Sequence, residues 1–126
     1  MPRRLLAANA AWMGVLWITR IKNANGSVGP IVLSLLMLGG AAYLLAVAFR
    51  RAPVAGVVPV AALHAGVWAV RGPMIAAADH PAGFIAVHET LAVISIALAV
   101  WLILRTREAL AAVPVGGVRS RSAPRA

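Results

Sequence analysis

The chain has 126 residues, of which 62% are hydrophobic and only 12% are charged, and its mean hydropathy is +0.89. A soluble domain is about half apolar and about a quarter charged, so this composition argues against a soluble globular domain. It also argues against disorder, except in the C-terminal tail. The composition predicts a small integral membrane protein with one transmembrane domain.

Basic residues outnumber acidic residues by 12 to 3, which gives a net charge of +9. The basic residues stand at the ends of apolar runs, as membrane topology requires, and not on a solvated face with interleaved aromatic residues. We therefore expect no nucleic-acid partner. The chain has no cysteine, which excludes disulfides and thiolate metal sites. The bias toward Arg, Ala, Gly, Val and Pro is typical of a GC-rich bacterium.

The first apolar run covers residues 5–19 and is short for a transmembrane helix, which needs about 17 to 25 residues. Two alternatives remain open, a cleaved signal peptide and a helix that lies flat on the membrane surface. The expected cleavage site is poor and the run has no polar face, so we predict a short first span.

Three further apolar runs are long enough to cross a bilayer, and they cover residues 30–49, 52–70 and 84–104. The segment between the last two contains Pro73, Asp79 and Pro81 and is predicted to be a loop. The sequence therefore predicts an all-α integral membrane four-helix bundle. Its transmembrane domain covers residues 1–107, and a disordered basic tail covers residues 108–126.

The distribution of Arg and Lys predicts the orientation of the four spans. Nine basic residues share the side of the N-terminus, the second loop and the tail, and three lie on the other side. Both termini are therefore expected in the cytoplasm, with the protein in the inner (plasma) membrane. Trp17 and Trp68 are then expected at the outer interface and Trp101 at the inner one.

Small residues four positions apart are expected to bring the helices together, because close approach drives association in lipid. Such pairs occur in three spans: Ala42 and Ala46, Ala62 and Gly66, Ser95 and Ala99. Gly39 and Gly40 predict a backbone groove or a kink in the second helix. Pro59 is expected to kink the third helix.

The candidate functional residues are concentrated between positions 64 and 89, where all three histidines and two of the three acidic residues lie: His64, Asp79, His80, His88 and Glu89. His64 and His88 are expected about 10 and 6 Å below the outer boundary, in the outer half of the third and fourth helices. Glu89 is expected either to remain protonated or to pair with His64, His88 or Arg71.

Three functional interpretations of these residues stand beside a structural one. His64 and His88 are candidate axial ligands of a haem b. His64, His80, His88 and Glu89 are candidate ligands of a divalent or copper ion. Glu89 with the histidines is a candidate relay for protons or cations. In the structural interpretation the histidines only fix the helical hairpin by hydrogen bonds.

Size favours a role that is not enzymatic, because four short helices without a large extramembrane loop leave little room for a complete active site. We therefore expect a structural or accessory subunit of a larger membrane assembly. Its expected partners are the lipid bilayer and either another membrane protein or a second copy of the chain.

Overall fold

The computed structural model describes residues 3–112, and this part of the chain is helical without any strand. The elements in chain order are α1 (Arg3–Lys22), α2 (Val28–Ala48), the 3-10 helix η1 (Val54–Gly56), α3 (Val57–Ala76) and α4 (Ala82–Ala111). The predicted all-α class with four helices is confirmed. Residues 108–111 of the tail predicted to be disordered belong to α4, and the part of that tail beyond Ala112 lies outside the described residues.

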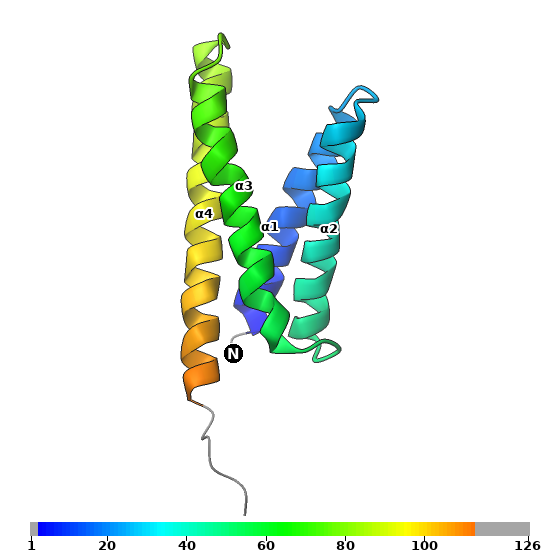
Figure 1. The fold of residues 1–126 in the computed structure, drawn as a ribbon, viewed down its shortest axis with the longest axis vertical. Helices are drawn as coiled ribbons and strands as arrows, with labels where there is room; N and C mark the ends of the chain where they lie inside the picture. The colour runs from blue at the N-terminus through cyan, green and yellow to red at the C-terminus, as the bar shows by residue number, and fades with distance from the viewer. Residues whose placement is uncertain (1–2, 113–126) are drawn as a thin grey trace, which may run out of the picture.

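Three helical segments are long and apolar enough to cross a membrane: Val28–Ala48, Val54–Ala76 and Ala82–Ala111. The first helix, α1, is not among them, because both of its ends are charged and its first half contains Asn9. With 20 residues it is nevertheless about 30 Å long, and it packs along the whole of α2 (Figure 1).

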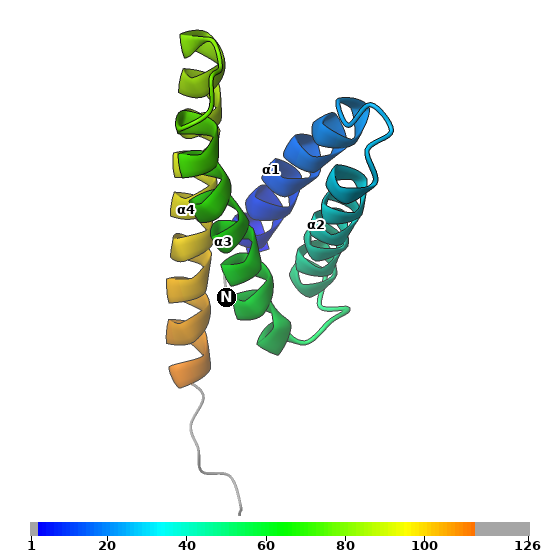
Figure 2. The same ribbon diagram turned by 45° about the horizontal axis from the view of Figure 1, so that its top comes forward.

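The helices form two antiparallel hairpins, α1–α2 and α3–α4, which contact each other much less than the helices within each hairpin do. The hairpins lie close together at the end that holds the α2–α3 connection (Figure 1) and diverge toward the other end (Figure 2). The first and last described residues lie at the close end. The diverging end carries the α1–α2 and α3–α4 connections, so a wedge-shaped space opens between the hairpins there.

The core lies where the two hairpins meet, and its side chains come from all four helices: Leu6, Met13, Leu44, Val57 and Leu102 are each at most 2% exposed. A hydrogen bond of 2.9 Å from Trp12 Nε1 to Ser95 Oγ joins α1 to α4. Buried hydroxyl groups on single helices donate to the carbonyl one turn earlier, as in the Ser34 bond to Pro30. Such bonds allow polar side chains to lie inside an apolar bundle.

Only one of the three small-residue pairs lies inside the bundle. Ser95 and Ala99 are buried, whereas Ala62 and Gly66 are exposed and Ala42 faces outward. Gly40 makes the close approach expected of it, because a Cβ atom there would lie 3.1 Å from Val60 Cγ1 and 3.4 Å from Met13 Cε. The spacing of small residues along the chain therefore does not identify which of them lie between helices.

The predicted kink at Pro59 is wrong, because α3 begins at Val57 and Pro59 lies in its first turn. The amide groups of the first turn have no intrahelical acceptor, so proline is tolerated there. The proline inside the helix is Pro73, in a segment predicted to be a loop. Charge at Arg71 did not end the helix, which continues to Ala76 and stops before Asp79 and Pro81.

The α2–α3 connection is held by the side chain of Tyr43. Its hydroxyl donates to the carbonyl of Pro53 and accepts from the Gly56 amide at 3.2 Å. Gly56 has ordinary helical angles, with φ −80° and ψ −5°, yet a Cβ atom there would overlap the Tyr43 ring. Glycine is therefore required at this position for space and not for backbone conformation.

Candidate functional site

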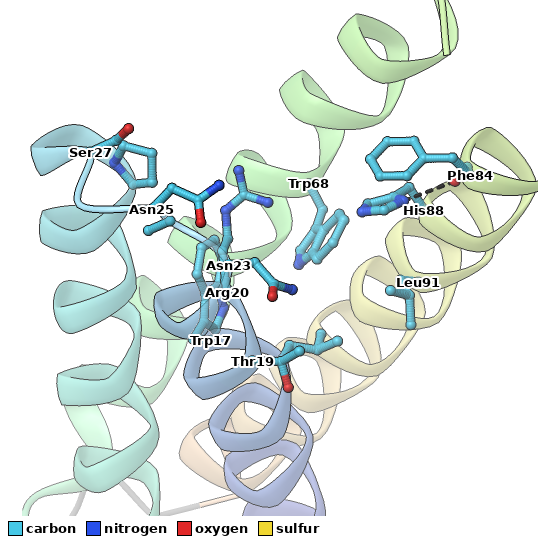
Figure 3. A pocket seen from close by; sticks show the side chains of 13 residues that line it. Trp17, Thr19, Arg20, Asn23, Asn25, Ser27, Trp68, Phe84, His88 and Leu91 are labelled. Atoms are coloured by element: carbon cyan, nitrogen blue, oxygen red, sulfur yellow. Dashed lines mark hydrogen bonds between the residues drawn. The ribbon is translucent and has the colours of Figure 1, made fainter. Parts of the chain in front are cut away.

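A cavity of about 530 Å³ occupies the space between the hairpins at the diverging end. We call it the wedge cavity. Its lining comes from all four helices and from the α1–α2 connection. Arg20 and Asn23 lie on its α1 side, and Trp68 and His88 lie across from them (Figure 3). Because both hairpins contribute, the cavity depends on the angle between them.

The α1 side of the wedge cavity carries two polar groups without partners. Trp17 is 1% exposed, and its Nε1 is buried with no hydrogen-bond acceptor. The Nε of the half-buried Arg20 is likewise without an acceptor. Residues three positions apart share a face of an α-helix, so both side chains line the same cavity. Buried polar groups are usually paired, which makes these two exceptional.

His64 lies beneath the wedge cavity in a cluster with two tryptophans. It is 2% exposed, and its Nε2 accepts a hydrogen bond of 3.1 Å from Trp68 Nε1. An imidazole nitrogen that accepts carries no proton, so the neutral ring holds its proton on Nδ1. The Trp17 ring centroid lies 6.3 Å from those of His64 and Trp68. His64 therefore joins α3 to α1 through its contact with Trp17.

The remaining two histidines flank one aromatic ring at the start of α4. The centroid of Phe84 lies 4.6 Å from that of His80 and 3.9 Å from that of His88. His88 Nδ1 lies 2.8 Å from the Phe84 carbonyl oxygen, so this nitrogen donates (Figure 3). His88 and Phe84 both line the wedge cavity.

Glu89 faces α3 and does not line the wedge cavity. A Cβ atom at Gly72 would lie 3.3 Å from its Oε2, so the carboxyl group packs against the backbone of α3. Its Oε1 is buried without a hydrogen-bond partner. Within residues 3–112 the ion pair found is Arg105–Glu108, and Glu89 makes none with His64, His88 or Arg71.

The predicted metal ligands are not assembled into one group. Within the described part of the chain, no three His, Cys, Asp or Glu side chains are placed to hold a metal ion. The structure brings His80 and His88 to Phe84, places His64 with the tryptophans, and turns Glu89 toward Gly72. Iron ligation by His64 Nε2 would require loss of its bond to Trp68, and the haem interpretation stays a prediction.

The sequence does not predict the wedge cavity, because Arg20 stands at the end of an apolar run, as topology charges do, and Trp17 and Trp68 are expected at the outer interface. Both tryptophans are buried, at 1% and 5% exposure, whereas Trp101 is 51% exposed. A signal was available in the spacing, since Trp17 and Arg20, like His64 and Trp68, share a helix face. No spacing along the chain could show that the two faces meet.

No family model, no curated protein and no solved structure matches this chain. The functional assignment therefore rests on the geometry of the chain itself.

Proposed function

We propose that this protein is an integral protein of the plasma membrane that spans the bilayer four times and acts as an accessory subunit of a larger membrane assembly. The observation that carries the proposal is the outward apolar surface of the helices that are apolar enough to cross a membrane. Large apolar side chains there are 44% to 66% exposed: Val32, Leu35, Leu36, Leu63, Val70, Val93 and Val100. A surface of this kind is incompatible with water and suits lipid or another helix.

The position of α1 supports a fourth span. It is antiparallel to α2 along its length (Figure 1), and it contributes Leu6, Met13 and Trp17 to the core. A helix that lay flat on the membrane surface would not fill the core of the bundle. The charge distribution supports cytoplasmic termini, since Arg3, Arg4, Arg50, Arg51, Arg105 and Arg107 belong to the close end of the bundle.

An apolar groove supports the accessory role. It measures about 410 Å³ and lies between α2 and α3, with Gly39, Gly40, Val60 and Leu63 among its lining residues. Gly39 in this groove is exposed, and nothing lies within 4 Å of a Cβ atom placed there. Small residues on a lipid-facing surface allow a transmembrane helix to approach closely. The proposed occupant is a transmembrane helix of another subunit.

Two measurements on the full-length tagged chain test this function. Membranes washed with alkaline carbonate should retain the protein, and its release would contradict membrane insertion. After mild detergent extraction of native membranes, the chain should run on a native gel in a particle that contains a second protein in fixed stoichiometry. A particle that contains only copies of this chain would contradict the accessory role.

A matched pair of substitutions locates the contact with the partner. Gly39→Leu should release the chain from the particle, because Gly39 lines the groove and the larger side chain prevents close helix approach. Ala97→Leu is the control, since Ala97 is also exposed in mid-helix but lies on α4. Equal behaviour of the two variants would contradict a partner contact at the groove.

A second candidate function, a proton or cation relay, is favoured by the unpartnered Oε1 of Glu89. Ionisable groups inside a membrane are costly and commonly mark ion pathways. In proteoliposomes of the full-length chain, Glu89→Gln should abolish proton flux measured with an enclosed pH-sensitive dye. Glu108→Gln is the control, because Glu108 is exposed and paired with Arg105. Absence of flux in the unmodified protein would eliminate the relay.

A further inference from the structure

We propose that the wedge cavity binds a phosphate group, and that the cavity best fits the headgroup phosphate of a membrane phospholipid. The assignment of the phosphate to a lipid rests on the proposed membrane insertion. The phosphate site itself rests on the side chains of the cavity.

The first argument is the unneutralised charge of Arg20. The whole chain has only three acidic residues. Of these, Glu108 pairs with Arg105, Glu89 packs against Gly72, and Asp79 is exposed in the α3–α4 connection. Arg20 therefore has no acidic partner among residues 3–112, although its Nε is buried. The planar guanidinium matches phosphate oxygens in a two-pronged hydrogen bond.

The second argument is independent of the charge and comes from Trp17. Trp17 is 1% exposed and lines the same cavity. Its indole nitrogen has no hydrogen-bond acceptor. An indole nitrogen is only a donor, so a ligand oxygen that displaced the atoms enclosing this nitrogen would satisfy it. Trp17 and Arg20 thus both require an acceptor on one face of α1.

The remaining lining fits the rest of a phospholipid headgroup. The side-chain amide of Asn23 adds a further donor group on the α1 side (Figure 3). Leu16, Leu91 and Trp68 supply apolar walls for the glycerol backbone and the first acyl carbons. The volume of about 530 Å³ is within the usual range for small-molecule sites. A combination of donors and apolar walls favours an amphiphile over a wholly polar anion.

The test uses full-length protein purified in a detergent without phosphate. Dioctanoyl phosphatidate, dioctanoylglycerol and inorganic phosphate are titrated separately, and bound ligand is counted by native mass spectrometry. The two lipids differ only in the phosphate group, so phosphatidate should bind at least about tenfold more tightly, as expected for a charge-assisted hydrogen-bond pair. Equal affinity for the two lipids would overturn the proposal.

Two donor side chains are substituted separately, so that misfolding of one variant does not decide the outcome of the test. Arg20→Gln should weaken phosphatidate binding at least about tenfold, and Trp17→Phe about threefold through loss of one donor. Arg20→Lys keeps the positive charge but not the planar guanidinium group, and should give an intermediate loss of phosphatidate affinity. The controls are Arg51→Gln, at the exposed close end, and Trp101→Phe, on the outside of α4.

The outcomes distinguish three questions: whether the phosphate site exists, whether its phosphate belongs to a lipid or is free, and whether the proposed membrane function holds. Tight binding of inorganic phosphate, equal to that of phosphatidate, would support the site and assign it to free phosphate. Unchanged binding in both Arg20→Gln and Trp17→Phe, or an equal loss in Arg51→Gln, would overturn the site. Release of the protein by carbonate would contradict the membrane function without affecting binding measured in detergent.

Discussion

Trp12 and Ser95 are separated by 83 positions, yet the indole nitrogen of one donates to the hydroxyl of the other at 2.9 Å. The bond connects α1 with α4 and therefore joins the two hairpins, whose other direct contacts are sparse compared with those inside each hairpin. Ser95 is fully buried. The bond lies in the region where the hairpins are close, so it helps to set the angle at which they diverge and the wedge cavity opens.

Loss of this bond should weaken the association of the hairpins. Trp12→Phe and Ser95→Ala should each lower the free energy of unfolding by about 0.5–1.5 kcal/mol. The double variant should lose little more than either single variant, because the two changes remove the same interaction. Thermal unfolding in detergent measures the effect. Trp101→Phe is the control, since that tryptophan is half-exposed, and strictly additive losses would contradict the coupling.

Adjacent glycines in α2 should respond differently to the same substitution. Gly40→Val places methyl groups against Val60 and Met13, which already lie 3.1 and 3.4 Å from a Cβ at that position. Overpacking of this kind typically costs about 1–3 kcal/mol. Nothing lies within 4 Å of a Cβ at Gly39, so Gly39→Val should leave the unfolding temperature nearly unchanged. Similar unfolding temperatures for both variants would contradict the close approach at Gly40.

Gly56→Ala should disrupt the α2–α3 connection, because the added methyl group would overlap the Tyr43 ring. We expect a loss of about 1–3 kcal/mol in detergent, typical of a forced shift of a packed side chain. In a Tyr43→Leu background the same Gly56→Ala change should cost much less, since the obstructing ring is absent. A loss that is equal in the two backgrounds would show that Tyr43 is not the cause.

The proposed orientation predicts which positions are accessible from outside the cell. In this cysteine-free chain, single cysteines at Ser27 or Ala78 should react with an impermeant thiol reagent applied to intact cells. Cysteine at Ala52 or Ser120 should react only after permeabilisation, because the proposed topology places both on the cytoplasmic side. Labelling at Ala52 in intact cells would reverse the orientation. Loss of an N-terminal tag would show that the first helix is cleaved.

The sequence by itself determined the class of fold and the number of helices. Apolar runs of about 20 residues leave few alternatives to helices, because a helix satisfies its backbone groups within one segment and is the usual form of such runs. The helix boundaries were less well determined. The apolar run ends at Arg71, but α3 continues to Ala76, since one charged residue does not break a helix as the later Asp79–Pro81 segment does.

Only the tertiary structure decided which side chains meet. Histidine positions predicted a site within the α3–α4 hairpin. Glu89 does pack against Gly72 inside that hairpin, but His64 contacts Trp17 of α1. The wedge cavity with Arg20 was not predicted at all. Its existence depends on the rotation of each helix about its axis and on the angle between the hairpins. Both are set by long-range packing such as the Trp12–Ser95 bond, and hydrophobic periodicity along one helix does not encode them.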